Sequence, residues 1–218
     1  MWIHENNNWT NFSWDVEIIS SKLADIRHRQ GLLLGIMKGV GFELKQEASL
    51  NVLTNDIVKS SAIEGEILNT VEVRSSIARR LGIDVAGLIP TSRYVDGIGE
   101  MMLDATQQFT KPLTKERLFD WHATLFPTGR SGMHRITVGA WRTMASETMQ
   151  VVSGPIGHEK VHYEAPLANR LEKEMKAFLK WFGSDYNTDP VLRAGIAHLW
   201  FEEIHPFEDG NGRIARAI

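Results

Sequence analysis

One polar stretch decides the fold of this chain, and it is His205-Pro206-Phe207-Glu208-Asp209-Gly210-Asn211-Gly212-Arg213-Ile214-Ala215-Arg216. An apolar helical pattern precedes it and ends near Ile204, and a second helix is expected to begin around Gly212. Gly210 and Gly212 allow backbone angles that other residues avoid, and they let main-chain N–H groups approach a ligand. The stretch is therefore predicted to be a tight loop between two helices, with an anion cradle at the start of the second helix.

The side chains of this loop suit chemistry on phosphates. His205 titrates near neutral pH and can take a proton from a hydroxyl group. Asp209 offers a hard oxygen ligand of the kind that Mg²⁺ accepts together with substrate phosphates. Arg213 and Arg216 lie one helical turn apart, where both can hold phosphate oxygens. A glycine-rich connection with incidental charges would not be expected to meet all these requirements, so the loop predicts phosphoryl or nucleotidyl transfer.

Helical periodicity dominates the rest of the chain. Apolar residues recur at helical spacing over about 14–34, 50–63, 69–82, 90–109, 114–126, 167–182 and 189–204. Asn69 and Asp189 are predicted N-caps, and Pro190 suits the first helical position. The buried stripe of the last segment is predicted to be Leu192, Ile196, Leu199, Trp200 and Ile204. We expect an all-α, mainly helical fold.

Residues 135–166 depart from this pattern. Thr137-Val138-Gly139-Ala140-Trp141 and Met149-Gln150-Val151-Val152-Ser153 are rich in β-formers, and Gly154-Pro155-Ile156-Gly157 is typical of a turn. A short β-hairpin, or flap, is expected on the helical body. The following His158-Glu159-Lys160-Val161-His162 matches the zinc-protease pattern, but that chemistry needs a helix, and the glycines, prolines and Val161-His162-Tyr163 favour extended structure.

Composition limits the class of protein. The chain has 218 residues, of which 43% are hydrophobic, a net charge of −3 and no cysteine, so disulfides, thiolate metal sites and cysteine nucleophiles are excluded. This charge provides no field that would attract nucleic acid. The longest apolar run, Leu32 to Met37, is far shorter than the roughly 18 residues of a membrane span. We expect no secretory signal, because Met1-Trp2-Ile3-His4-Glu5 lacks a basic segment followed by an apolar one. We expect a cytoplasmic protein that binds neither membranes nor nucleic acid directly.

Two further expectations concern the N-terminal part. Gly31, Gly35 and Gly39 predict close packing of one helix against a neighbour, because no strand precedes them as a dinucleotide-binding loop would require. Residues 1–85 are expected to form an N-terminal helical region, although no Pro/Gly/Ser-rich linker marks its end.

The loop matches, position for position, the H-x-F-x-[DE]-G-N-G-R-x-x-R motif of Fic-domain proteins. The chain thus resembles the Fic/DOC family, most of whose members are protein adenylyltransferases. The resemblance extends from about Pro90 to the C-terminus and includes the Trp121-His122 helix, an Arg142 strand and the flap. It implies a Fic domain over 86–218, cut short just after the motif because the motif helix of the family continues further. The N-terminal region resembles the helical leader of one bacterial Fic branch.

The resemblance also implies roles for individual residues. His205 would be the catalytic base that deprotonates a target hydroxyl, and Asp209 would hold Mg²⁺ on the α- and β-phosphates of ATP. The hydroxyl would attack the α-phosphate and release pyrophosphate. The nucleotide-binding residues would be Asp209, Gly210, Asn211, Gly212, Arg213 and Arg216. The flap residues that would dock the target by strand addition are Met149, Val151, Val152 and Ser153.

A second motif lies upstream. Ser60-Ser61-Ala62-Ile63-Glu64-Gly65 fits the [ST]-x-x-x-E-[GN] inhibitory helix of some Fic proteins, here expected over about 50–66. By this resemblance Ser60, Glu64 and Gly65 are regulatory. Glu64 would pair with Arg216, obstruct the position of the γ-phosphate and repel the triphosphate.

The expected function is a Mg²⁺-dependent protein adenylyltransferase that transfers AMP from ATP to a Ser, Thr or Tyr hydroxyl and is inhibited by Glu64. The expected partners are ATP and a target protein, which could be the chain itself; a homodimer stays open. Two alternatives remain. The same site could remove AMP from a modified protein, or the chain could be a non-catalytic nucleotide sensor, such as a toxin–antitoxin partner.

Overall fold

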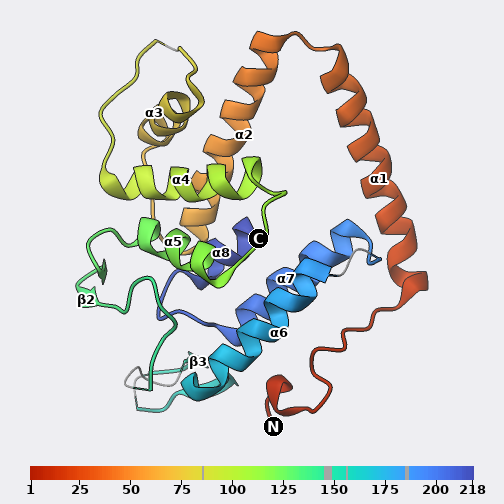
Figure 1. The fold of residues 1–218 in the computed structure, drawn as a ribbon, viewed down its shortest axis with the longest axis vertical. Helices are drawn as coiled ribbons and strands as arrows, with labels where there is room; N and C mark the ends of the chain where they lie inside the picture. The colour runs from red at the N-terminus through yellow and green to blue at the C-terminus, as the bar shows by residue number, and fades with distance from the viewer. Residues whose placement is uncertain (85, 145–148, 156, 185–186) are drawn as a thin grey trace.

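The computed structural model describes residues 1–84, 86–144, 149–155, 157–184 and 187–218. Over these residues the chain forms eight α-helices and two small two-stranded sheets, which confirms the predicted mainly helical fold (Figure 1). The helices are α1 (Val16–Gly39), α2 (Phe42–Ile63), α3 (Thr70–Leu81), α4 (Arg93–Gln107), α5 (Lys115–Leu125), α6 (Leu171–Ser184), α7 (Pro190–Ile204) and α8 (Asn211–Ala217). The strands are β1 (Arg130–Ser131), β2 (His134–Arg135), β3 (Gln150–Ser153) and β4 (Lys160–Glu164). Among these helices, none has a stretch both long and apolar enough to cross a membrane.

Short polar side chains fix where several helices begin. The Asn69 carboxamide accepts hydrogen bonds from the N–H groups of Val71 and Glu72, and the Asp189 carboxylate accepts one from Val191 at 2.8 Å. Gly82 ends α3 in the left-handed conformation, with φ 66°. The predicted starts of α3 and α7 and the predicted end of α3 are confirmed.

The core places α8 at the centre of the molecule. α8 packs against α7, α4, α2 and α5, so the last helix is enclosed by elements from both halves of the chain (Figure 1). The largest fully buried side chains are Phe178, Phe201, Phe207, Leu50, Ile57, Ile77, Met101, Leu118, Leu125, Leu171, Met175 and Ile204. The stripe predicted on α7 is wrong at Leu199, which is 43% exposed, because α7 turns Phe201 into the core instead.

Helix α1 stands away from this core (Figure 1). None of its residues is buried, and Leu32, Leu33 and Leu34 are each more than half exposed. Its glycines at 31, 35 and 39 have nothing within 4 Å of the position a Cβ would take. The predicted close packing of these glycines is therefore wrong.

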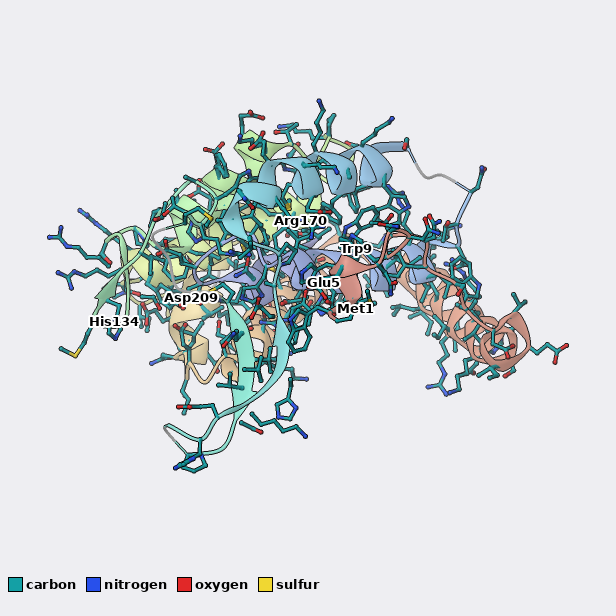
Figure 2. All side chains as sticks on the ribbon, turned by 90° about the horizontal axis from the view of Figure 1, so that it is seen from below. Met1, Glu5, Trp9, His134, Arg170 and Asp209 are labelled. Carbon is teal, nitrogen blue, oxygen red and sulfur yellow. The ribbon has the colours of Figure 1, made fainter. Side chains whose placement is uncertain are left out.

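The segment before α1 folds back onto α6 and α7. Trp9 packs edge-on against Trp200, with ring centroids 5.7 Å apart, and Arg170 donates a hydrogen bond to the carbonyl of His4. Figure 2 labels Trp9 and Arg170 in this region. Helix α3, in the predicted N-terminal region, packs along α4 of the predicted Fic domain. The boundary near residue 85 remains a prediction.

The flap is a hairpin of β3 and β4. Val151 pairs with Tyr163 and Ser153 with Lys160 in antiparallel register, which confirms the predicted hairpin. Of the predicted turn, Ile156 lies outside the described residues. The residues of the zinc-protease pattern do not lie on a helix, since His162 belongs to β4.

The strand predicted at Thr137–Trp141, with its extension to Arg142, is wrong. This segment is irregular because side chains from the 205–216 loop and α5 accept hydrogen bonds from its backbone N–H groups. The Thr137 N–H donates to the Glu208 carboxylate at 3.0 Å, and the Gly139 N–H donates to Nδ1 of His122 at 3.2 Å. These N–H groups therefore bond to side chains of the site and not to a neighbouring strand.

Candidate active site

Phe207 anchors the 205–216 loop in the core. Its side chain is fully buried and its ring stacks on the His122 imidazole, with centroids 4.1 Å apart and planes inclined by 7°. Trp141 covers Phe207 from another side, with ring centroids 5.1 Å apart. The apolar residue within a polar motif therefore holds the loop against the body of the protein.

Asn211 closes the loop on itself. Its side-chain oxygen accepts a hydrogen bond from the Phe207 N–H, and its side-chain nitrogen donates to the Phe207 carbonyl, both at 2.9 Å. The Asn211 side chain is 2% exposed, so these bonds are shielded from water. Of the predicted nucleotide-binding residues, Asn211 can thus offer a ligand its main chain only.

The start of the loop is held by Arg142, which is 5% exposed. The Arg142 N–H donates to the carbonyl of Pro206 at 2.9 Å, and its Nε donates to the carbonyl of His205 at 2.8 Å. A third bond reaches the carbonyl of Pro166, just after β4. The same guanidinium therefore joins the loop to the base of the flap.

His205 reverses the chain at the end of α7. It is in the left-handed region, with φ 50°, which is uncommon for a residue other than glycine. Burial lowers the pKa of the imidazole below its ordinary value, so at neutral pH the ring is uncharged and able to accept a proton. The ring borders a small cavity of about 40 Å³ whose other lining residues are Met149, Gln150, Val151, Tyr163 and Ala165. The imidazole thus lies beside the flap strand.

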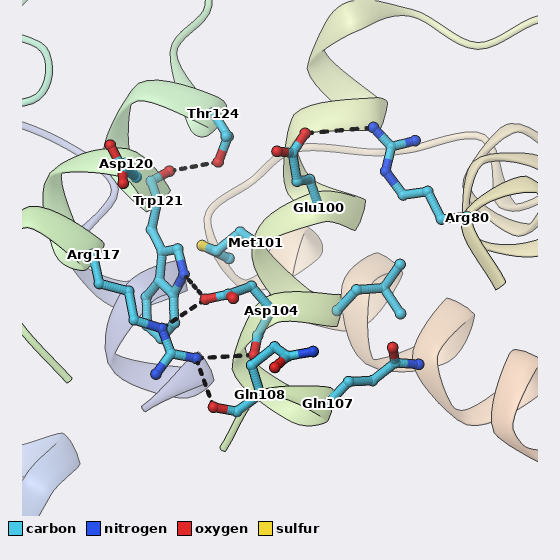
Figure 3. Close-up of a pocket in the computed structure, with 11 residues that line it drawn as sticks. Arg80, Glu100, Met101, Asp104, Gln107, Gln108, Arg117, Asp120, Trp121 and Thr124 are labelled. Carbon is cyan, nitrogen blue, oxygen red and sulfur yellow. Dashed lines mark hydrogen bonds and ion pairs between the residues drawn. The ribbon is translucent and has the colours of Figure 1, made fainter. Parts of the chain in front are cut away.

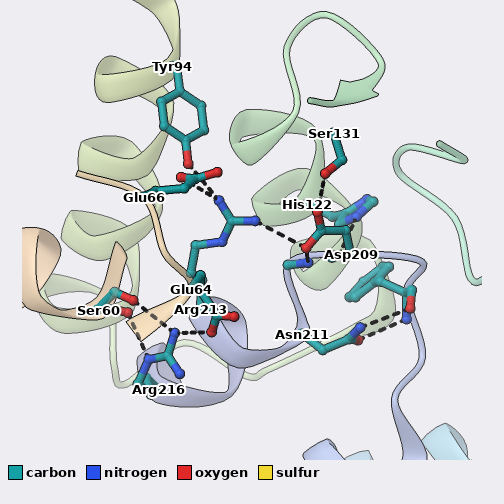
Figure 4. Close-up of polar contacts among 12 residues, drawn as sticks. Ser60, Glu64, Glu66, Tyr94, His122, Ser131, Asp209, Asn211, Arg213 and Arg216 are labelled. Carbon is teal, nitrogen blue, oxygen red and sulfur yellow. Dashed lines mark hydrogen bonds and ion pairs between the residues drawn. The ribbon is translucent and has the colours of Figure 1, made fainter. Parts of the chain in front are cut away.

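The Asp209 carboxylate lies at the other end of the loop. It accepts hydrogen bonds from the Ser131 hydroxyl, the Gly210 N–H at 2.5 Å and Nη2 of Arg213 at 3.3 Å (Figure 4). The Asp209 side chain is 38% exposed, which leaves it accessible to a ligand. Ser131 lies in the small β1–β2 hairpin, and only its place in the fold identifies it as a neighbour of Asp209.

The Asp209 carboxylate by itself is compatible with binding a magnesium ion. Within the described ranges, no three His, Cys, Asp or Glu side chains are grouped to hold a metal by themselves. Mg²⁺ commonly binds through one or two carboxylates and substrate phosphates, so a full set of protein ligands is not required.

The two arginines of the loop are bound by different carboxylates. Arg216 donates to the Glu64 carboxylate at 2.5 Å and to the Ser60 hydroxyl at 2.8 Å (Figure 4). Arg213 donates to the Glu66 carboxylate at 3.2 Å and to the Tyr94 hydroxyl at 2.6 Å. The structure therefore brings together Ser60, Glu64 and Arg216 as the sequence predicted, while Glu66 and Tyr94 are additional residues.

The end of α2 explains why two glutamates reach this site. Gly65 is in the left-handed conformation, with φ 80°. Its N–H donates to the carbonyl of Ala62, and the Glu66 N–H donates to that of Ser61, both at 3.0 Å. This is a Schellman motif, in which glycine ends the helix and reverses the chain. The carboxylates on either side of Gly65 consequently meet two arginines on one face of α8.

Gly210 is required by its backbone conformation and by a close contact, whereas the contact at Gly212 is with the flexible end of a side chain. A Cβ at Gly210 would lie 2.8 Å from the Phe126 ring, and one at Gly212 would collide with the Glu64 carboxylate. Gly210 also has φ 83°. Gly210 therefore lets the loop pass close to the end of α5, and Gly212 leaves room for the Glu64 carboxylate.

The flap offers an exposed apolar strand. Val151 and Val152 are 57% and 46% exposed, and the Ser153 hydroxyl lies 2.6 Å from Nε2 of His162 on β4. Met149 is tied to the strand end through its carbonyl, which accepts from the N–H of Ala165. Whether these residues dock a target remains a prediction.

A separate cavity of about 440 Å³ lies between α4 and α5 (Figure 3). Four of its charged groups form two ion pairs: Arg117 lies 2.7 Å from Asp104, and Arg80 lies 3.6 Å from Glu100. Its lining includes no residue of the 205–216 loop, so this cavity does not belong to the candidate site.

His122 gives the site a stability that depends on pH. Its Nδ1 accepts from Gly139 and its Nε2 lies 3.1 Å from the carbonyl of Asp209, so the neutral ring carries its proton on Nε2. Burial lowers its pKa to about 4. Because the unfolded chain binds this proton first as the pH falls, the free energy of unfolding should drop between about pH 6.5 and pH 4, by about 3 kcal/mol in total.

Urea denaturation at several pH values measures this drop. His122→Gln should reduce the slope of the free energy of unfolding against pH by the amount that corresponds to about one proton. His28→Gln, which replaces an exposed histidine on α1, should leave this slope unchanged. Burial also lowers the pKa of His4 and of His205, and both contribute to the slope in all three proteins. Equal slopes for the wild type and His122→Gln would show that His122 is not the group responsible.

Two family models match this chain. Residues 112–218 match the Fic/DOC family, and residues 2–83 match a domain of unknown function (DUF4172). Among curated proteins, the chain is 25% identical over 173 residues to "Protein adenylyltransferase Fic" of Nematostella vectensis, covering 74% of this chain and 35% of the relative. The relative of the same name from Drosophila willistoni is also 25% identical, and 30% of its length is covered. The chain thus spans about a third of these relatives.

Solved structures show the same fold. A Fic family protein from Desulfovibrio desulfuricans G20 superimposes with a TM-score of 0.58 at 24% identity, covering 94% of this chain and 57% of that protein. A Fic domain containing signaling protein from Bacteroides thetaiotaomicron VPI-5482 gives a TM-score of 0.57 at 22% identity, covering 80% of this chain and 63% of that protein.

Proposed function

Residues 112–218 of this chain are a Fic domain, and on that basis we propose that the protein transfers AMP from ATP to a hydroxyl group of a target protein. The observation that carries the proposal is the uncharged His205 imidazole beside the flap, in the same anchored loop as Asp209 and Arg213. Base, carboxylate and cation are then fixed relative to one another before a substrate binds, which favours catalysis by positioning.

The proposed AMP transfer is a displacement at the α-phosphate, in which one bond to phosphorus forms and one breaks. The oxygen of a Ser, Thr or Tyr side chain forms a bond to the α-phosphorus, and the bond from that phosphorus to the oxygen bridging the α- and β-phosphates breaks. Pyrophosphate leaves. Nε2 of His205 accepts the hydroxyl proton, since Nδ1 lies 3.3 Å from the carbonyl of Glu202.

The remaining charges of the loop suit the triphosphate. Arg213 and Arg216 would bind phosphate oxygens, together with the main chain of Gly210, Asn211 and Gly212. Asp209 would hold Mg²⁺, which neutralises phosphate charge when it is bound. The flap would hold the target by strand addition along β3, and this would bring the target hydroxyl toward His205.

Glu64 would inhibit the enzyme by occupying Arg216. Its carboxylate lies 2.5 Å from Nη2 of that arginine, in a contact that a phosphate oxygen would otherwise make. A carboxylate in this place also repels the triphosphate. The inhibition is therefore a competition between two anions for one guanidinium.

The position of the transferred label tests this function. Glu64→Gly protein is incubated with Mg²⁺ and ATP labelled at either the α- or the γ-phosphate, and protein-bound label is followed with intact-mass spectrometry. We expect label from α-labelled ATP only, on the protein itself or on an added target. Transfer from the γ-position would contradict AMP transfer. Loss of AMP from a modified target would favour the reverse reaction, and nucleotide binding without transfer a sensor.

A further inference from the structure

Arg213 is fixed at one end of its guanidinium. Nη1 donates to the Tyr94 hydroxyl at 2.6 Å and to the Glu66 carboxylate at 3.2 Å. The Phe126 ring covers one face of the group, 5.1 Å from its central carbon. The side chain is 3% exposed, so its orientation depends on these partners and not on water.

On the opposite edge of the Arg213 guanidinium, only some of the N–H donors have hydrogen-bond partners among the described residues. A guanidinium has five N–H donors in a rigid fork, and the two donors of Nη1 are already bound. Nη2 makes one long bond, 3.3 Å, to Asp209. Nε is buried and has no hydrogen-bond partner within the described part of the chain. A buried donor without a partner is unfavourable, and the edge formed by Nε and Nη2 suits two oxygens of a phosphate.

We propose that Glu66 and Tyr94 are positioning residues that hold Arg213 so that its Nε–Nη2 edge faces the phosphates of the bound nucleotide. This inference rests on the proposed function and adds a regulatory consequence. The Schellman turn at the end of α2 then carries an inhibitory carboxylate, Glu64, and a supporting one, Glu66, on the two sides of Gly65.

Glu66 and Tyr94 come from other parts of the chain than the 205–216 loop that they support. Glu66 lies within residues 2–83 and Tyr94 is on α4, so both are outside the 112–218 match. Burial raises the pKa of Glu66, and the Arg213 charge opposes that rise, so this guanidinium is the neighbour that favours the ionised carboxylate. Because Glu66 has to stay on Arg213 while Glu64 has to leave Arg216, activation should displace the Glu64 side chain and leave the end of α2 in place.

Nucleotide affinity in the Glu64→Gly background tests the inference. We expect Tyr94→Phe and Glu66→Gln each to raise the KM for ATP about tenfold. Tyr94→Phe removes one hydrogen bond to the charged guanidinium, and Glu66→Gln removes the negative charge of the ion pair. The kcat at saturating ATP should change little, because the phosphate contact exists before the chemical step. Glu100→Gln, which alters an exposed glutamate paired with Arg80, is the matched control.

A double-mutant cycle separates this role from a general one. In an Arg213→Ala background, Tyr94→Phe and Glu66→Gln should have no further effect on ATP affinity, measured by calorimetry. Additive losses, unchanged affinity in the single variants, or a gain of activity in Glu66→Gln would overturn the inference and leave the proposed function standing. Failure of the Glu64→Gly parent to bind ATP would overturn both.

Discussion

Replacing His205 by alanine in the Glu64→Gly protein is expected to reduce AMP transfer by about 10²–10⁴-fold. The imidazole borders the flap cavity and is uncharged at neutral pH, so no other group of that cavity lining is placed as well to accept the hydroxyl proton. The affinity for ATP should persist, because the phosphate-binding groups stay in place. Protein-bound α-label reports the transfer, and calorimetry reports the affinity.

The matched control for this experiment is His28→Ala, a histidine exposed on α1. It should transfer AMP at the rate of the Glu64→Gly parent. Equal labelling in the His205→Ala and His28→Ala proteins would remove His205 from the mechanism, whatever the affinity for ATP.

The second large effect is an increase in the rate of AMP transfer, expected from Glu64→Gly in the otherwise unchanged protein. Arg216 loses its 2.5 Å contact with the carboxylate and becomes available to phosphate, while Ser60 still accepts from its Nε. A hydrogen bond between charged groups contributes about 1.5–3 kcal/mol, so transfer at limiting ATP should rise about 10- to 100-fold. Initial rates of labelling measure the gain.

Glu47→Gly provides the comparison for that gain. Glu47 is also on α2 and also binds an arginine, Arg74, at 2.9 Å, but away from the 205–216 loop. Its replacement should leave the transfer rate unchanged. A Glu64→Gly protein no faster than Glu47→Gly would mean that the Glu64–Arg216 contact does not limit activity.

Features encoded by neighbouring residues could be predicted from the sequence. The caps Asn69 and Asp189, the end of α3 at Gly82 and the helix–loop–helix at 205–216 all depend on residues within one or two turns of each other. The contact between Glu64 and Arg216 spans 152 positions, and only the resemblance to a known motif pointed to it. Its geometry follows from the Schellman turn at Gly65.

Features that depend on tertiary partners could not be predicted. Thr137–Trp141 has strand-forming residues, yet Glu208 and His122 bind its N–H groups and prevent pairing. The sequence gives no sign that the Asn211 side chain closes the loop through Phe207. Glu66 could have been noticed as a second acid beside the glycine that ends α2. Nothing near Tyr94 or Ser131 in the sequence indicates a place at this site.

A calorimetric titration of Mg²⁺-ATP into the Glu64→Gly protein tests the central claim most directly, because every role assigned above requires a nucleotide at the 205–216 loop. The account predicts one nucleotide bound per chain, with the affinity reduced about tenfold or more by Arg213→Ala. A Glu64→Gly protein that is folded and takes up no ATP would contradict it.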